Sequence, residues 1–155
     1  MYENVFNSIE RELRNEEGVA NELDYVEQTS WVLFLKYLHD LENERRDRAE
    51  LDGTDYTPII DGEFRWDRWA APKKGGEFDH NVAKIGDDLI AFVDQELFPY
   101  LASFRETATG PRTIEYKIGE VFTELRNKFR SGYILRDVLE VLDGLDNKPI
   151  IGKKS

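Results

Sequence analysis

The sequence contains no cysteine and only two histidines among its 155 residues. Without cysteine the chain can form no disulfide, no thiolate zinc site and no cysteine nucleophile. Its longest uninterrupted apolar run covers residues 31–35 and is far too short to span a bilayer. The first residues lack the apolar core and the cleavage site of a signal peptide. These absences predict a soluble, cytoplasmic protein with no membrane partner.

Basic residues are scarce relative to acids: 21 Lys and Arg against 32 Asp and Glu, for a net charge of -11. Phosphate repels a surface of this charge, so we expect DNA contact only through a local basic patch or through partner subunits. Hydrophobic residues make up 40% of the chain and aromatic residues 12%. This composition is enough for one folded domain with a core of its own.

Motifs for chemistry are missing as well. Neither a glycine-rich phosphate loop nor a GxSxG nucleophile elbow occurs in the sequence. His39 and Asp40 are adjacent but lack the further ligands of a metal site. Paired acids such as Asp87 and Asp88 are more simply explained as a solvated helix face. We therefore assign no catalytic, cofactor-binding or metal-binding residue and expect no enzyme activity from these 155 residues alone.

Apolar residues recur at helical spacing along most of the chain, which predicts an all-α bundle of about five or six helices. A first helix is expected to end at Gly18, with the apolar stripe Tyr2, Phe6, Ile9 and Leu13. A last helix is expected to end near Gly144, with the stripe Leu135, Val138, Leu139, Leu142 and Leu145.

The second helix should run from about residue 24 to about residue 50 and should be the central, buried one, because it is apolar on nearly all sides. We expect its inner stripe to consist of Val26, Leu33, Phe34, Tyr37 and Leu41. Its charged end should be a solvated extension with ion pairs between Glu42 and Arg46 and between Glu44 and Arg48.

Helical spacing breaks down around residues 52–80, where we expect a small β-hairpin or loop insertion. Asp61-Gly62 between short apolar runs is a hairpin signal over residues 59–64. The proline, lysines and glycines of residues 72–76 indicate a mobile loop.

Two more helices are expected beyond this insertion. The first spans about residues 85–104, with Asp87 and Asp88 at its positive N-terminal end and a kink or helix junction at Pro99. The next begins with Thr113 as its N-cap and runs to Phe129 before a stop at 131–132.

Two basic clusters are candidates for DNA contact. The first combines basic residues with aromatic ones and comprises Arg65, Arg68, Lys73 and Lys74 beside Phe64, Trp66 and Trp69. Such a mixture can hold a nucleic-acid backbone and stack on bases. We favour the alternative that the tryptophans pack the insertion onto the bundle; the three aromatic residues are also candidates for contact with a partner protein. The second cluster is Arg126, Lys128 and Arg130, which could equally be favourable charge at a helix C-terminus.

Several strings follow one another in an order that identifies a family resemblance. They are residues 22–38 (ELDYVEQTSWVLFLKYL), 56–60 (YTPII), 64–66 (FRW) with 69–70 (WA), 96–101 (ELFPYL), 113–120 (TIEYKIGE), and 131–133 (SGY) with 135–138 (LRDV). In this order they resemble the N-terminal helical domain of the modification subunits of type I restriction–modification systems. The resemblance covers roughly residues 3–146, and residues 147–155 do not share it.

The resemblance implies a parent subunit that transfers a methyl group from S-adenosylmethionine to the exocyclic amine of adenine in double-stranded DNA. Such a subunit works with a specificity subunit and a restriction subunit, and its N-terminal domain helps to close around DNA. The family's cofactor-binding and catalytic motifs do not occur here, so we expect a fragment or truncated product with a domain at 1–146 and a non-native or disordered tail at 147–155. The alternative is a free-standing acidic helical protein that mimics DNA or acts as an adaptor.

Overall fold

The computed structural model describes residues 2–145 and the side chains of residues 4–145. The regular secondary structure of the described residues consists of helices and one small hairpin, which confirms the predicted all-α fold with a hairpin insertion. The elements are α1 (Tyr2–Leu13), α2 (Glu22–Asp52), the 3-10 helix η1 (Gly62–Phe64), α3 (Trp66–Trp69), β1 (Lys73–Lys74), β2 (Glu77–Phe78), α4 (Gly86–Phe92), the π-helical turn η2 (Val93–Leu97), α5 (Phe98–Thr107), α6 (Ile114–Glu124) and α7 (Gly132–Asp143).

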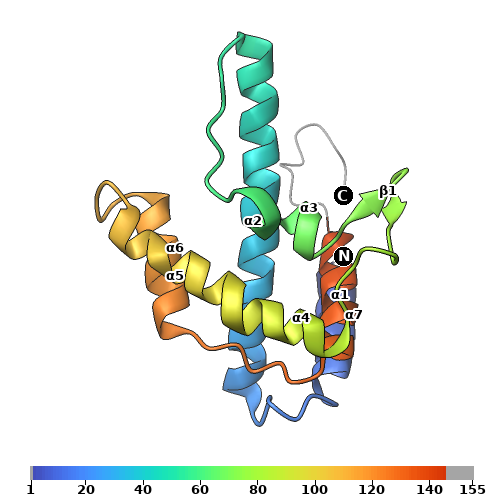
Figure 1. Ribbon diagram of the computed structural model, residues 1–155. Coiled ribbons are helices and arrows are strands. Elements are labelled where there is room, and N and C mark those ends of the chain that lie inside the picture. Colours follow the sequence, from blue (N-terminus) through green and yellow to red (C-terminus); the bar gives the residue numbers. More distant parts are fainter. Residues whose placement is uncertain (1, 146–155) are drawn as a thin grey trace.

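The long helix α2 runs through the middle of the molecule (Figure 1). A hairpin of α5 and α6 packs on one side of α2, and α1 packs with α7 on the other. The rod made by α4, η2 and α5 crosses α2 and joins the two sides. No helix within residues 2–145 combines the length and the apolar character needed to cross a membrane.

Aromatic rings at the centre hold these layers together. Trp31 of α2 meets Phe98 of α5 edge to face, with ring centroids 5.0 Å apart. It also meets Phe129 edge to face at 6.1 Å. All three side chains are buried, and burying rings of this size contributes much of the hydrophobic stabilisation of a small domain.

The predicted inner stripe of α2 was wrong for two of its five members, whereas Leu33, Phe34 and Leu41 are partly buried against the core. Val26 and Tyr37 are 49% and 50% exposed. The side that faces the core carries Gln28, Trp31, Val32, Leu35 and Leu38 instead. Because α2 is apolar on nearly all sides, spacing alone cannot tell which apolar face meets the other helices.

The charged end of α2 also differs from the prediction. Within the described residues, Glu42 forms no ion pair with Arg46, and Glu44 forms none with Arg48. Glu42 is buried and accepts hydrogen bonds from the Tyr56 hydroxyl (2.7 Å) and from the backbone N–H groups of Ile59 (2.6 Å) and Ile60 (3.0 Å). Burial and this carboxylate together raise the pKa of Tyr56 to about 12. Glu42 therefore fixes the chain that returns from the tip of α2.

The hairpin lies later in the insertion than predicted. Asp61-Gly62 begins η1 rather than a hairpin turn. The hairpin pairs Lys73 with Phe78 and Lys74 with Glu77, in the segment predicted as a mobile loop. Gly75 and Gly76 form its turn with φ angles of 64° and 83°, and glycine adopts such positive φ values without strain.

The rod formed by α4, η2 and α5 confirms the predicted break at Pro99. Asp87 and Asp88 stand in the first turn of α4 as expected. The wider π-helical turn of η2 comes directly before Pro99, which is the second residue of α5. A proline has no N–H to donate to the preceding turn, which is why regular α-helical bonding is interrupted there.

The predicted ends of the last two helices were partly right. Thr113 caps α6 by accepting from the Tyr116 N–H at 3.1 Å, as expected. Residues 125–130 do not continue α6, however, because Leu125 already has an extended backbone. Ser131 caps the start of α7 by accepting from the Ile134 N–H. The expected stop at Gly144 and the buried stripe of α7 are confirmed. The predicted tail, residues 147–155, lies outside the described residues.

Candidate functional site

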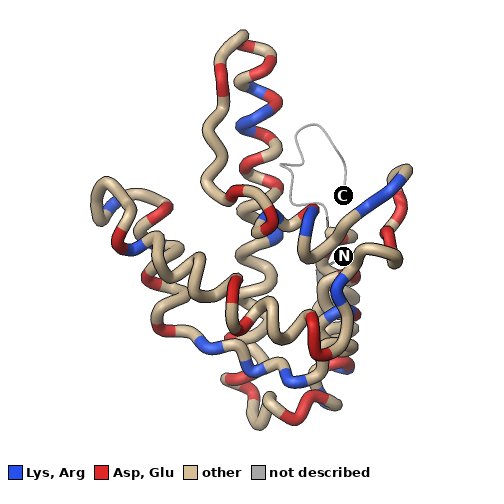
Figure 2. Tube along the Cα trace, viewed as in Figure 1, with Lys and Arg blue, Asp and Glu red and all other residues tan. Residues whose placement is uncertain are grey.

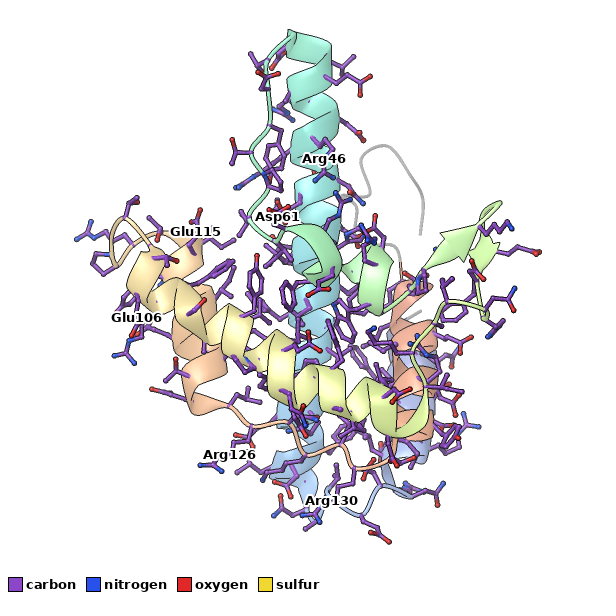
Figure 3. All side chains as sticks on the ribbon, in the orientation of Figure 1. Arg46, Asp61, Glu106, Glu115, Arg126 and Arg130 are labelled. Carbon is purple, nitrogen blue, oxygen red and sulfur yellow. The ribbon has the colours of Figure 1, made fainter. Side chains whose placement is uncertain are left out.

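An extended segment connects α6 to α7, and we call residues 125–130 the basic segment. Arg126, Lys128 and Arg130 occupy every second position along it. Arg126 and Arg130 are exposed at the edge of the molecule (Figure 3). The expected C-terminal helix position for this cluster was wrong, because α6 ends at Glu124.

Gln28 of α2 holds the middle of the basic segment. Its amide nitrogen donates to the backbone carbonyl of Arg126 at 2.9 Å, and its amide oxygen accepts from the backbone N–H of Lys128 at 2.9 Å. The same oxygen accepts from the Trp31 indole at 2.8 Å. Gln28 is fully buried, so these bonds are made without competition from water.

Glu16 holds the end of the basic segment. Its carboxylate accepts the backbone N–H groups of Arg130 at 2.9 Å and Ser131 at 3.0 Å, and that of Gly18 at 3.2 Å. Only 3% of Glu16 is exposed. Hydrogen bonds to a charged acceptor are stronger than neutral ones, so a buried carboxylate with three such donors fixes the backbone firmly.

Gly18 permits the close packing of this loop against the basic segment. A Cβ atom at Gly18 would lie 1.6 Å from the carbonyl oxygen of Lys128, which no side chain could tolerate without a shift of backbone. The prediction that Gly18 ends the first helix was wrong, because α1 ends at Leu13. Close approach to another strand of backbone is the reason for glycine at this position.

The three basic side chains of the segment differ in their partners. Lys128 forms an ion pair with the buried carboxylate of Asp24. Their mutual hydrogen bond is the main cause that lowers the pKa of Asp24 and raises the pKa of Lys128. Within the described part of the chain, no carboxylate stands at ion-pair distance from Arg126 or Arg130. These two guanidinium groups are therefore available to an external anion.

The other basic candidates belong to a different part of the surface. Lys73 pairs with Asp143 at 2.8 Å, and Arg65 pairs with Asp67 at 3.0 Å. Arg68 and Lys74 are exposed. Figure 2 shows the lysines of the hairpin well away from the positive charges of the basic segment. The structure thus does not bring the two predicted basic clusters together.

The aromatic candidates are mainly part of the core. Trp66 and Trp69 are only 3% and 1% exposed, and the Trp66 indole donates to Asp143 at 2.9 Å. Phe64 is half-buried and stacks on Tyr100 with ring centroids 4.0 Å apart. This burial favours the interpretation that the tryptophans pack the insertion onto the bundle. Contact of these residues with a partner stays a prediction.

The pair of His39 and Asp40 is occupied by other contacts. Asp40 binds the ammonium of Lys36 through both oxygens at 2.7 and 2.8 Å. His39 lines a small cavity with Glu42 and accepts an Asn43 amide contact at 3.2 Å. In the stretch that the structure describes, no cluster of three or more His, Asp or Glu side chains is arranged to hold a metal ion.

Sequence reasoning missed Glu16, Gln28 and Asp24, the residues that position the basic segment. Their partners lie 98 to 115 residues further along the chain, so no local spacing joins them. A glutamate in a loop and a glutamine in a helix look like ordinary surface residues in the sequence. Only the fold shows that all three are buried against the same segment.

Comparison with known proteins finds a family model and a relative that match nearly the whole chain. A family model described as the HsdM N-terminal domain matches residues 3–148. The type I restriction enzyme EcoEI methylase subunit of Escherichia coli is 31% identical over 143 residues, which are 92% of this chain and 26% of that protein.

Two solved structures share the fold. A modification subunit of a putative type I restriction enzyme from Vibrio vulnificus YJ016 has a TM-score of 0.79 and 31% identity, over 94% of this chain and 31% of its own. A chain from a study of complex assembly and conformational transition of the type I R-M system has a TM-score of 0.67 and 31% identity, over 94% and 26%. The chain thus spans about a quarter to a third of the length of these relatives. It belongs to the HsdM N-terminal domain family of type I modification subunits.

Proposed function

We propose that this domain clamps DNA and supports subunit assembly in a type I modification enzyme, without taking part in methyl transfer itself. One observation supports this proposal most strongly. The backbone at Arg126 is held by the buried Gln28 of α2, and the backbone at Arg130 is held by the buried Glu16 of the preceding loop. Guanidinium groups bind phosphate oxygens with two parallel hydrogen bonds, and a fixed backbone lowers the entropy lost on binding.

The dimensions of the basic segment suit a DNA backbone. Arg126 and Arg130 are four positions apart, so their backbones lie at most about 13 Å from each other at roughly 3.3 Å per residue. This length is close to the rise of about four base pairs along a duplex. Because the domain as a whole is acidic, this contact is local and draws most of its strength from the assembled enzyme.

The family to which the chain belongs supports a proposal for the partners and for the chemistry of the parent protein. We assign the specificity subunit and the restriction subunit as protein partners, and double-stranded DNA as the ligand of the complex. S-adenosylmethionine and adenine-N6 methylation belong to the remaining sequence of the parent, because the present residues offer no glycine-rich loop that fits the cofactor. Any base flipping would also occur at that other site.

The test compares two double variants that remove the same charge. Arg126→Ala with Arg130→Ala changes the basic segment, whereas Arg112→Ala with Lys117→Ala changes two exposed residues, one in the turn before α6 and one within α6. Affinity for duplex DNA is measured by fluorescence anisotropy over a series of low salt concentrations. The first pair should weaken binding and reduce the salt slope by about 2, at close to 0.9 per phosphate contact. Equal effects of both pairs, or no salt-dependent binding by the unmodified chain, would contradict a DNA contact at this segment.

A further inference from the structure

Lys128 lies at the centre of the basic segment, and its ammonium group already has an internal partner. Arg126 stands two positions before it and Arg130 two positions after it. The ammonium group forms an ion pair with a carboxylate oxygen of Asp24, in the first turn of α2. Among the three cations of the segment, Lys128 alone has a carboxylate at ion-pair distance within residues 4–145.

The two members of this ion pair differ in their freedom to move. Asp24 is fixed, because its second carboxylate oxygen accepts the Ala20 N–H at 2.9 Å and its own N–H donates to the side chain of Asn21 at 2.9 Å. Its side chain is 8% exposed, whereas the side chain of Lys128 is 39% exposed. The carboxylate is therefore built into the fold, and the ammonium group stands at the surface.

The backbone of Lys128 stays in place when its side chain moves. Its N–H donates to the buried Gln28 at 2.9 Å, and its carbonyl oxygen packs against Gly18. A lysine side chain is flexible and carries three donors on its ammonium group. Lys128 can therefore turn its ammonium group from Asp24 to an external anion without any change in the shape of the basic segment.

A second ion pair of α2 shows what a closed pair looks like. Lys36 and Asp40 are 6% and 17% exposed, and Lys36 binds both carboxylate oxygens, at 2.7 and 2.8 Å. Lys128 binds a single oxygen of Asp24 and is far more exposed. Water and salt screen an exposed charge, so such a pair is weak. A DNA backbone held by the neighbouring arginines would bring phosphate to Lys128 at high effective concentration and could displace the carboxylate.

We propose that Asp24 competes with DNA phosphate for Lys128 and thereby restrains DNA binding by the basic segment. Free of DNA, the segment offers two available cations, Arg126 and Arg130. The third contact forms only when a phosphate displaces the Asp24 carboxylate, which reduces the net gain from that contact. This inference rests on the DNA contact proposed above and adds its regulation.

Asp24→Asn tests the restraint, because it removes the competing charge and keeps the size of the side chain. The amide oxygen can accept the Ala20 N–H, which turns the amide NH₂ group toward Lys128, where it offers no acceptor. Anisotropy with the same duplex and salt series is the measurement. The salt slope should increase by about 1, the value of one further phosphate contact, and affinity at the lowest salt should rise at least about threefold.

Adding Lys128→Met identifies the source of this gain. Methionine keeps an unbranched, flexible side chain and removes the ammonium group. In the Asp24→Asn background this second substitution should cancel the increase in salt slope and in affinity. Circular dichroism checks that each variant is folded.

A measurement on the unmodified chain is independent of these variants. The NMR signal of the Asp24 carboxyl carbon should shift when the chain is saturated with duplex DNA, because the carboxylate loses its ammonium partner. The carboxyl carbon of Asp40 should keep its signal, since its partner Lys36 is buried.

Two further variants are controls for charge and for place. Glu27→Gln removes a negative charge that also raises the pKa of Lys128, but it leaves the pair with Asp24 intact. Asp143→Asn frees a lysine elsewhere: the Asp143 carboxylate binds an indole N–H with one oxygen and Lys73 with the other. Each control should change the salt slope by less than half as much as Asp24→Asn.

Three results would overturn the restraint. They are an equal salt slope in Asp24→Asn and Glu27→Gln, a gain that survives Lys128→Met, and an Asp24 carboxyl signal that DNA leaves unmoved. Failure of the DNA contact itself looks different, because Arg126→Ala with Arg130→Ala would then leave binding unchanged. If that pair weakens binding while Asp24→Asn does nothing, the contact stands and only the restraint fails.

Discussion

The buried carboxylate of Glu16 accepts the backbone N–H of Arg130 at 2.9 Å, although the two residues are 114 positions apart. This bond joins the loop after α1 to the chain that enters α7. It also ends the stretch of extended backbone whose middle is held by Gln28. The shape of the basic segment is therefore set by residues from the first fifth of the sequence.

Replacing Glu16 by Gln should destabilise the domain. The side chain keeps its size, but an amide offers one acceptor oxygen in place of two and turns an N–H group toward a backbone N–H donor. We expect a loss of about 2 kcal/mol in the free energy of unfolding, as for other buried donors left unsatisfied. Urea denaturation measures the change, with Glu17→Gln, an exposed neighbour, as the control. An equal effect of the two substitutions would contradict the role assigned to Glu16.

Gly18→Ala should also destabilise the domain, through a steric clash. The new Cβ would meet the carbonyl oxygen of Lys128, so the loop or the basic segment must move. We expect a cost of about 1–3 kcal/mol, typical of overpacking. Gly110→Ala is the control, because nothing lies within 4 Å of a Cβ at Gly110. Thermal or urea unfolding of the two variants decides the matter, and a stable Gly18→Ala protein would show that the approach is looser than described.

Stability should decline below neutral pH because of His39. Burial lowers the pKa of His39 from its ordinary value of 6.5, although Asp67 and Asp40 oppose this effect. The unfolded chain then binds a proton near pH 6.5 while the folded chain does not, so the free energy of unfolding falls as the pH falls from 6.5 toward the folded pKa. Urea titrations at a series of pH values measure this decline.

The His39→Gln variant should lose that component of the pH dependence. His80→Gln is the matched control, because it removes an exposed histidine and leaves His39 in place. The Asn43 oxygen accepts from Arg46 at 3.0 Å, which turns the Asn43 amide nitrogen toward the His39 ring. A neutral ring nitrogen can accept that hydrogen bond, but a protonated one cannot. Identical pH profiles for the wild-type chain and His39→Gln would refute this explanation.

Glu42→Gln should loosen the chain that returns along α2. The carboxylate accepts the backbone N–H groups of Ile59 and Ile60, and both bonds are weakened by an amide. We expect hydrogen exchange at these two amides to accelerate by about tenfold, which corresponds to roughly 1.4 kcal/mol of lost protection. Exchange measured by NMR provides the readout, and Glu44→Gln, which changes an exposed residue on the same helix, should leave both amides protected.

Local signals accounted for much of the helical framework. The apolar stripe of α7 and the cap at Thr113 depend on residues within a few positions of each other, and both were predicted correctly. Local signals failed where one residue type has two uses. Ser131 was interpreted as the end of a helix but is the N-cap of the next one. Both Asp61-Gly62 and Gly75-Gly76 are turn signals, and only the second joins two strands.

Tertiary contacts decided the rest. The sequence shows that α2 is apolar on more than one side, but the choice between Trp31 and Tyr37 as the buried residue depends on where the other helices pack. Arg126 and Arg130 were found as a basic cluster, whereas the exposure of both was not predictable. Their positions depend on the hydrogen bonds that Gln28 and Glu16 form with the backbone of the basic segment. These partners are about 100 positions away in the sequence, and no spacing rule relates residues so far apart.

Helix α2 passes through the core and continues beyond the other helices as a projecting arm (Figure 1). Its 31 residues correspond to about 46 Å of continuous helix. The three bonds to Glu42 fasten the returning chain at the base of this arm. Most residues of the arm beyond Glu42 are exposed, so this half of α2 depends on its own backbone hydrogen bonds and on the returning chain, and it keeps its charged surface in solvent.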